Sequence, residues 1–99
     1  MQKIYSVFDS KVGAYLQPMF FRSKGEAIRS FSTAVSDSAH DFNKYAEDFT
    51  LFELGEWDQE KGVLLPHPTA LAVGKAIEFV PRDVEPVTPV DNRTRSMAV

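Results

Sequence analysis

The sequence predicts an α+β fold, in which a small antiparallel sheet of four to five strands is packed by one main helix over about residues 24–38. Three observations predict it. Several segments alternate polar and apolar residues, as strands do. One segment that begins with a serine has apolar residues at helical spacing. A chain of 99 residues is long enough for only one modest hydrophobic core. We therefore expect a single α+β domain over residues 1–80, followed by a flexible tail with several prolines over residues 81–99.

The first two strands are expected within residues 3–22. Residues 3–8 alternate between two sides of a strand, with Lys3, Tyr5 and Val7 on one side and Ile4, Ser6 and Phe8 on the other. Two of the six are aromatic and two are β-branched, which favours a strand. Residues 9–13 (Asp-Ser-Lys-Val-Gly) predict a turn, because Asp and Ser bond to their own backbone and Gly accepts positive φ. Residues 14–22 are again expected to be extended, and Pro18 indicates an edge strand or a strand with a bend in its middle.

The helix has the clearest local signal in the chain. Ser23 precedes Glu26 by three residues, which is the capping-box pattern of a helix start. The apolar residues that follow at helical spacing form one narrow stripe of Ala27, Ile28, Phe31, Ala34 and Val35. We expect Ser23 to cap this helix, Phe31 to be its central core residue, and the helix to end near residues 37–39.

The middle of the chain predicts a second pair of strands. Residues 40–48 are polar and acidic, and we expect a loop there, with a single helical turn as the alternative. Residues 49–57 favour a long strand, because apolar side chains alternate along it. Residues 58–62 begin with Asp and end with Gly, which predicts a hairpin loop into a short strand at 63–65.

Prolines mark the end of the predicted sheet. Pro66 and Pro68 are expected to stop the strand at 63–65, since proline cannot donate a ladder hydrogen bond. Residues 69–76 are expected to form a short helical turn, and residues 77–80 a last strand. The sequence then contains three more prolines and no further aromatic residue, which is typical of a segment that does not order itself alone.

The motifs exclude several kinds of chemistry. The chain contains no cysteine, which excludes disulfides, thiolate nucleophiles and cysteine-ligated metals. Its glycines form no phosphate-binding motif, and no serine lies in a nucleophile elbow. We interpret His40 and His67 as surface histidines beside loops, and the many acidic side chains as a solvated rim. The protein is therefore expected not to be an enzyme and to have no cofactor and no metal site.

The net charge of −3 conceals an uneven distribution. Residues 1–36 carry five basic and two acidic side chains, a sum of +3, whereas residues 37–60 carry eight acidic side chains and one lysine, a sum of −7. Basic side chains among exposed aromatic rings on a sheet can bind single-stranded nucleic acid, and the alternative is that the charges only solvate the surface. The candidate DNA-binding residues are Lys3, Tyr5, Lys11, Tyr15, Phe21, Arg22, Lys24 and Arg29.

Four separated blocks carry a family resemblance. They are residues 3–12 (KIYSVFDSKV), 24–31 (KGEAIRSF), 50–58 (TLFELGEWD) and 74–79 (GKAIEF). Together they resemble the small nonstructural protein of gokushoviruses, the single-stranded DNA phages of the Microviridae. The resemblance covers about residues 1–80. It implies an early-to-middle phage protein of the bacterial host cytoplasm that binds DNA during single-stranded genome replication or packaging.

Two functions remain open at this point. The first is an accessory protein that binds phage single-stranded DNA. The second is a protein–protein adaptor that contacts the replication initiator, the procapsid or a host factor through the acidic segment 37–60. No apolar run is long enough to span a bilayer, so no membrane partner is expected. A small core and a proline-interrupted sheet edge also predict a homodimer.

Overall fold

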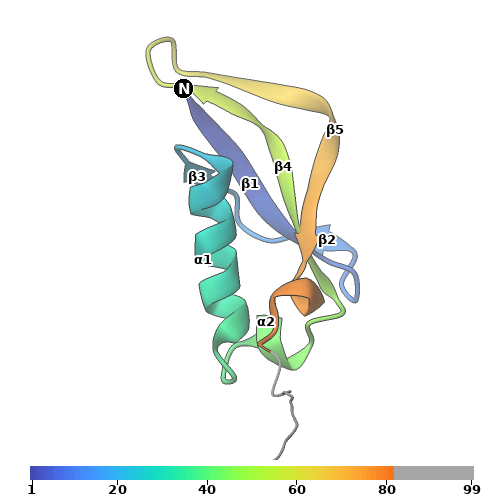
Figure 1. The fold of residues 1–99 in the computed structure, drawn as a ribbon. Coiled ribbons are helices and arrows are strands. Elements are labelled where there is room, and N and C mark those ends of the chain that lie inside the picture. The colour runs from blue at the N-terminus through green and yellow to red at the C-terminus, as the bar shows by residue number, and fades with distance from the viewer. Residues whose placement is uncertain (82–99) are drawn as a thin grey trace, which may run out of the picture.

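The computed structural model describes residues 1–81, so the tail that was predicted over 81–99 lies outside the described residues except for Pro81. Figure 1 shows a curled antiparallel sheet with one main helix beside it, which confirms the α+β class. The elements in chain order are β1 (Gln2–Asp9), β2 (Ala14–Tyr15), β3 (Met19–Phe21), α1 (Lys24–Ser36), α2 (Asp41–Lys44), β4 (Phe49–Asp58), β5 (Val63–Lys75) and the 3₁₀ helix η1 (Ala76–Phe79).

The sheet has the strand order β2-β1-β4-β5, and every pair is antiparallel. The short strands β2 and β3 both pair with the same edge of β1, β2 beside its end and β3 beside its start (Figure 1). The chain leaves the ladder between Leu16 and Pro18, so the expected strand over residues 14–22 is two short strands with a break at the proline.

The two faces of the sheet differ in what covers them. Tyr5, Val7 and Leu51 point toward α1 and are fully buried, and we call their side of the sheet the inner face. Successive strand residues point to opposite faces, and direct antiparallel partners share a face. We call the opposite side the outer face. Ile4 and Phe8 point toward it, because each is adjacent in β1 to a residue that points inward. The inner-face core consists of Tyr5, Val7, Ala27, Phe31, Val35, Ala46, Phe49, Leu51 and Ala76.

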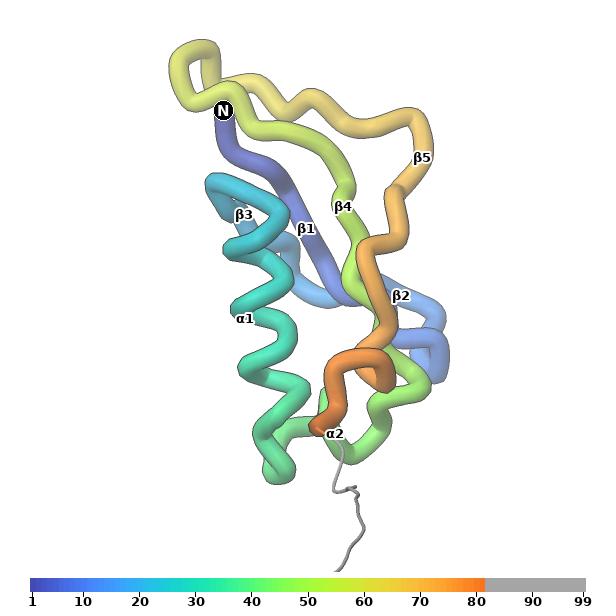
Figure 2. The backbone as a smooth tube through the Cα atoms, in the orientation of Figure 1, coloured from blue at the N-terminus to red at the C-terminus, as the bar shows by residue number. Residues whose placement is uncertain are grey.

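All three helices of residues 1–81 pack on the inner face. The ring of Phe31 on α1 lies 5.5 Å from that of Phe42 on α2 and 5.7 Å from that of Phe79 on η1. Phe31 is 4% exposed, so it is the central core residue of the helix, as predicted. Figure 2 shows the backbones of α1, α2 and η1 converging at one end of the molecule.

Helix α1 begins where the sequence predicts. The Ser23 hydroxyl accepts a hydrogen bond from the Glu26 amide at 3.2 Å, which confirms the N-cap. The Glu26 carboxylate accepts hydrogen bonds from the Arg22 amide and guanidinium, both at 2.9 Å, and these bonds lower the pKa of Glu26. The helix ends at Ser36 with Asp37 as its C-cap, at the start of the expected range.

We expect Ser23→Ala to lower the free energy of unfolding by about 1 kcal/mol, because the Glu26 amide would lose its side-chain acceptor. Chemical denaturation monitored by circular dichroism measures this loss. Ser30→Ala is the matched control, since Ser30 is exposed in the middle of α1 and alanine has the higher helix propensity. Equal losses for the two variants would show that the cap contributes nothing specific.

The predictions for residues 66–80 are wrong. Strand β5 continues through Pro66 and Pro68 to Lys75, where the sequence predicted a stop and then a helical turn. Its prolines are tolerated because β5 lies at the sheet edge and pairs only with β4. The predicted last strand at 77–80 is instead η1, which folds Phe79 back against Gly74.

Two other expectations have different outcomes. The hairpin loop at 58–62 is confirmed, with Gly62 at φ 66°. Residues 40–48 contain the single helical turn that was the alternative to a loop, and the His40 ring nitrogen Nδ1 caps it by accepting from the Phe42 amide at 3.0 Å. His40 is therefore half-buried rather than a free surface histidine.

A displaced stretch interrupts the ladder between β4 and β5. Glu53 pairs with Leu71 and Gly55 with Pro66, so residues 67–70 arch away opposite Leu54. The backbone of β5 approaches Gly55 so closely that a Cβ there would lie 2.8 Å from the Cα of Pro66. Glycine at this position therefore permits the sharp bend that curls the sheet (Figure 2).

Candidate nucleic-acid interface

The predicted DNA-binding residues do not form one surface. Lys3, Tyr5 and Phe21 lie on the inner face, where Lys3 and Phe21 are direct partners across β1 and β3. Tyr15 pairs with Phe8 and lies on the outer face. The others lie in the β1–β2 turn (Lys11), just before α1 (Arg22) and on the exposed surface of α1 (Lys24 and Arg29).

Tyr5 is not available for base stacking, and its prediction as a stacking ring is wrong. Its side chain is 0% exposed, because it points toward the helix together with Val7. Its ring meets that of Phe21 edge-on at 5.9 Å, and Phe21 is itself half-buried against the core. Burial raises the pKa of the Tyr5 hydroxyl, which donates to Glu53 Oε1 at 3.0 Å.

Two of the predicted basic residues are engaged with carboxylates. Lys3 Nζ lies 3.9 Å from Glu53 and 3.7 Å from Glu56. Arg22 lies 2.9 Å from Glu26. Their charges are thus offset locally, and neither cation is placed beside Tyr15.

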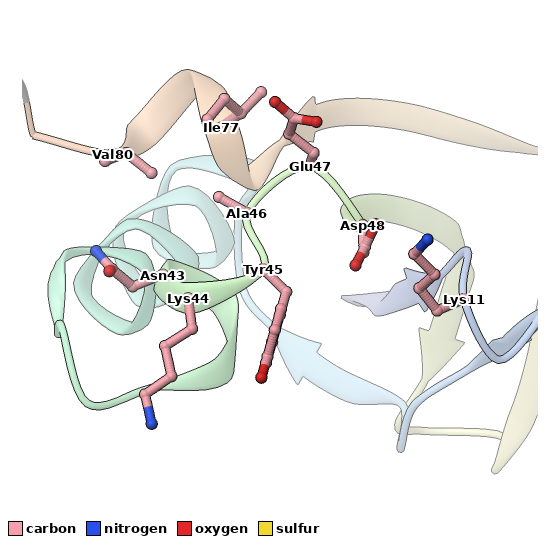
Figure 3. Close-up of a pocket in the computed structure, with 9 residues that line it drawn as sticks. All are labelled: Lys11, Asn43, Lys44, Tyr45, Ala46, Glu47, Asp48, Ile77 and Val80. Atoms are coloured by element: carbon pink, nitrogen blue, oxygen red, sulfur yellow. The ribbon is translucent and has the colours of Figure 1, made fainter.

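Lys11 lies among acidic side chains at the end of the molecule that carries α2. It lines a pocket of about 460 Å³ together with Tyr45, Glu47 and Asp48 (Figure 3). Lys11 and Asp48 lie close together in this view, at the opposite side of the pocket from Lys44. Lys11 also lines a neighbouring hollow with Asp9, Asp41 and Asp48, so its side chain lies in an acidic surrounding.

The outer face gathers aromatic rings in two groups. In the first, the ring of Tyr15 lies 4.9 Å from Phe8 and 5.6 Å from Phe52. In the second, the ring of Phe20 lies 6.1 Å from Trp57. Tyr15 and Phe20 are each 44% exposed, and the other three rings are half-buried. Of these five rings, the sequence analysis named only Tyr15 as a candidate site residue. It missed Phe8 and Phe20 in the N-terminal region, and it missed Phe52 and Trp57, which belong to β4.

The charge of the outer face differs from that of the whole chain. Among residues 1–81, no strand residue that points to this face is acidic, since the four acidic strand residues all point inward: Asp9, Glu53, Glu56 and Asp58. Lys75 on β5 pairs with Thr50, which in turn pairs with Phe8, so this lysine lies in the same row as the first ring group. A polyanion could therefore approach the rings without meeting a carboxylate on their own face.

A buried polar cluster lies on the inner face, around Glu53. Its Oε2 lies 2.7 Å from His67 Nε2, while its Oε1 accepts from Tyr5. Burial alone would raise the pKa of the Glu53 carboxyl, but hydrogen bonds from His67 and Tyr5, with the nearby Lys3 ammonium, hold that pKa below its ordinary value. Both carboxylate oxygens have partners, so the cluster fastens the arch at 67–70 to the sheet.

The interpretation of Glu53 and His67 as surface groups is wrong. Glu53 is 7% exposed, and His67 is half-buried against it. Glu53 is two residues after Leu51 and four after Phe49, so it lies on the same buried side of β4. This spacing could have predicted its burial from the sequence. His67 had no such signal, because its position depends on the arch in β5.

The acidic segment 37–60 does not form one contact surface. Its first part, 37–48, surrounds α2, and its last part, 56–60, lies at the β4–β5 hairpin at the opposite end of the molecule (Figure 2). The strand between them spans about 30 Å, since ten residues rise by roughly 3.3 Å each. An adaptor would therefore contact only one of these two acidic ends at a time.

The fold and the ring-lined face define a small α+β protein with a sheet face that no helix of residues 1–81 covers. Residues 2–79 match the family described as Phage ORF5 protein, and the chain belongs to this family. A curated relative, Protein ORF5 of Chlamydia phage 1, is 38% identical over 66 residues, which are 63% of this chain and 69% of the relative.

Chlamydia phage 1 is a gokushovirus of the Microviridae, so the resemblance found in the sequence is confirmed. No solved structure matches the chain. The protein is thus a phage accessory protein. The name of the relative, Protein ORF5, gives no enzymatic activity for that relative. In the described part of the chain, no helix has the length and apolar character needed to cross a membrane.

Proposed function

We propose that this phage accessory protein binds single-stranded DNA on the outer face of its sheet, with aromatic rings stacking on unpaired bases. One observation carries the proposal: rings from four strands gather on a face that no described helix covers. The most exposed rings, Tyr15 and Phe20, are the main contacts. Stacking suits any base, because every base has a π-face.

The charge distribution sets how the binding should depend on salt. Each neutralised phosphate of a single strand contributes about −0.7 to the slope of log affinity against log salt. Lys75 is the cation that lies in a row with the rings, and one neutralised phosphate gives an expected slope of about −0.7. Affinity should come mainly from stacking, and duplex DNA should bind poorly because its bases are already stacked and paired.

A fluorescence titration tests the proposal. Trp57 is the only tryptophan and lies in the second ring group, so its emission should be quenched as oligothymidine binds. Each of Tyr15→Ala and Phe20→Ala should weaken binding about 5- to 150-fold, the effect of losing one stacked base. Tyr45→Ala is the matched control, because Tyr45 is 58% exposed but lies at the α2 end of the molecule.

Two results of this titration would contradict the proposal. If neither thymidine nor mixed-sequence single strands bind at about 50 mM salt, where electrostatic attraction is still strong, the proposal is wrong. Equal losses in Tyr45→Ala and Tyr15→Ala would also contradict it. The adaptor function would then replace it, with a phage or host protein as the partner.

A further inference from the structure

The two ring groups of the outer face are separated along β1. Phe8 pairs with Tyr15 in the first group, and Ile4 pairs with Phe20 in the second. Phe8 and Ile4 are four residues apart on one strand, so the two groups lie about 13 Å apart at roughly 3.3 Å per residue. Figure 1 shows the same separation, with β2 and β3 beside opposite ends of β1.

We propose that these groups are two separate stacking subsites. Together they select single-stranded DNA in which two unpaired bases are separated by one intervening nucleotide. The first subsite is Tyr15 with Phe8 and Phe52, and the second is Phe20 with Trp57. This inference rests on the proposed function, because it concerns the same face and the same ligand. It adds the length and spacing of the DNA that the face accepts.

The spacing follows from the dimensions of DNA. Stacked nucleotides are about 3.4 Å apart along a strand, and an extended backbone covers roughly twice that distance per nucleotide. A separation of about 13 Å therefore corresponds to two extended backbone steps. Two adjacent bases cannot reach both subsites, whereas bases i and i+2 can, so the shortest ligand that occupies both subsites is three nucleotides long.

The link between β2 and β3 covers the surface between the subsites, because Ser6, which lies between Ile4 and Phe8 on β1, is 1% exposed. Residues Tyr15–Pro18, which join β2 to β3, line a shallow hollow of about 370 Å³. The Ser6 hydroxyl donates to the carbonyl of Leu16 at 2.7 Å and holds this link against β1. In the two-subsite arrangement, the base between the two stacked ones would lie over this link and need not be stacked. Lys75, in the row of the first subsite, is placed for a phosphate beside it.

Spacing can be tested with ligands of constant charge. The probes are sugar–phosphate octamers that are abasic except for two thymines, which are adjacent in one probe and separated by one abasic residue in the other. The separated pair should bind about 5- to 150-fold more tightly, the gain from one additional stacked base. Phe20→Ala should abolish this difference, because only the first subsite would remain. Circular dichroism of the variant confirms that it is folded.

The outcomes separate this inference from the proposed function. Equal affinity for the two spacings, with tight binding of an all-thymine octamer, overturns the two-subsite inference and leaves the proposed function standing. Failure of the all-thymine octamer to bind overturns both. A preference for adjacent thymines would show a single extended stack and would also overturn the inference.

Discussion

Phe31→Ala is expected to lower the free energy of unfolding by about 3–5 kcal/mol. The ring is 4% exposed and joins three elements, since it contacts Phe42 on α2 and Phe79 on η1 as well as the sheet beneath α1. Removing it leaves a cavity where these elements meet. Domains of this size are stable by only about 5–15 kcal/mol, so this variant should be partly unfolded at moderate temperature.

Denaturant unfolding followed by circular dichroism measures this loss. Phe20→Ala is the matched control, because it removes the same ring from a position that is 44% exposed on the outer face. It should cost clearly less stability while weakening DNA binding. A Phe31→Ala variant that unfolds at the same denaturant concentration as Phe20→Ala would show that α1 is not anchored through this ring.

The elements that could be predicted are those whose signals are local. Helix α1 combines a capping serine, a glutamate three residues later and an apolar stripe within 13 residues, and the structure has each of them. Strands β1 and β4 are rich in aromatic and β-branched side chains over much of their length, a composition that favours strands. No long-range information is needed to recognise either pattern.

Strand β5 could not be predicted in the same way, because its course depends on its place in the sheet. Pro66 and Pro68 end a central strand but not an edge strand, and edge position is decided by pairing with β4. Leu71 and Val73 are two residues apart, as on one face of a strand, whereas Val73 and Ile77 are four apart, as on one face of a helix, so the local pattern fits both. The turn that does form, η1, is fixed by the packing of Phe79 on Gly74 and Phe31.

The candidate site was only partly predictable, since the face of a strand residue depends on which side the helix packs. Tyr5 and Tyr15 are equally aromatic and both lie near lysines, yet Tyr5 is buried under α1 and Tyr15 is on the outer face. A shift of one residue in register would exchange the two faces. Phe52 and Trp57 belong to β4, which is far from β1 in the sequence. They reach the site only because β4 pairs with β1.

The second large effect is expected at the buried carboxylate of Glu53. Glu53→Leu should lower the free energy of unfolding by about 1–3 kcal/mol, because the fully buried Tyr5 hydroxyl would lose its acceptor. His67 would lose its partner as well, so the arch at 67–70 should loosen. Hydrogen exchange measured residue by residue should then show faster exchange in β5 than in α1.

The same cluster predicts a dependence on pH. The hydrogen bonds from His67 and Tyr5 hold the pKa of Glu53 below its ordinary value, so the ionised carboxylate stabilises the folded state. That contribution is fully present above the unfolded pKa, about 4.3 for a glutamate, and is lost as the pH falls through the lower folded pKa. The stability advantage of the parent over Glu53→Gln should therefore shrink as the pH falls from 7 to about 3.

An exposed glutamate provides the control for this experiment. Glu47 lies at the surface near α2, so Glu47→Gln should track the parent across the same pH range. If the difference between the parent and Glu53→Gln stays constant down to pH of about 3, the ionised carboxylate is not what fastens β5. The arch would then be held by the close approach of β5 to Gly55 alone, and Gly55→Ala would be the more damaging substitution.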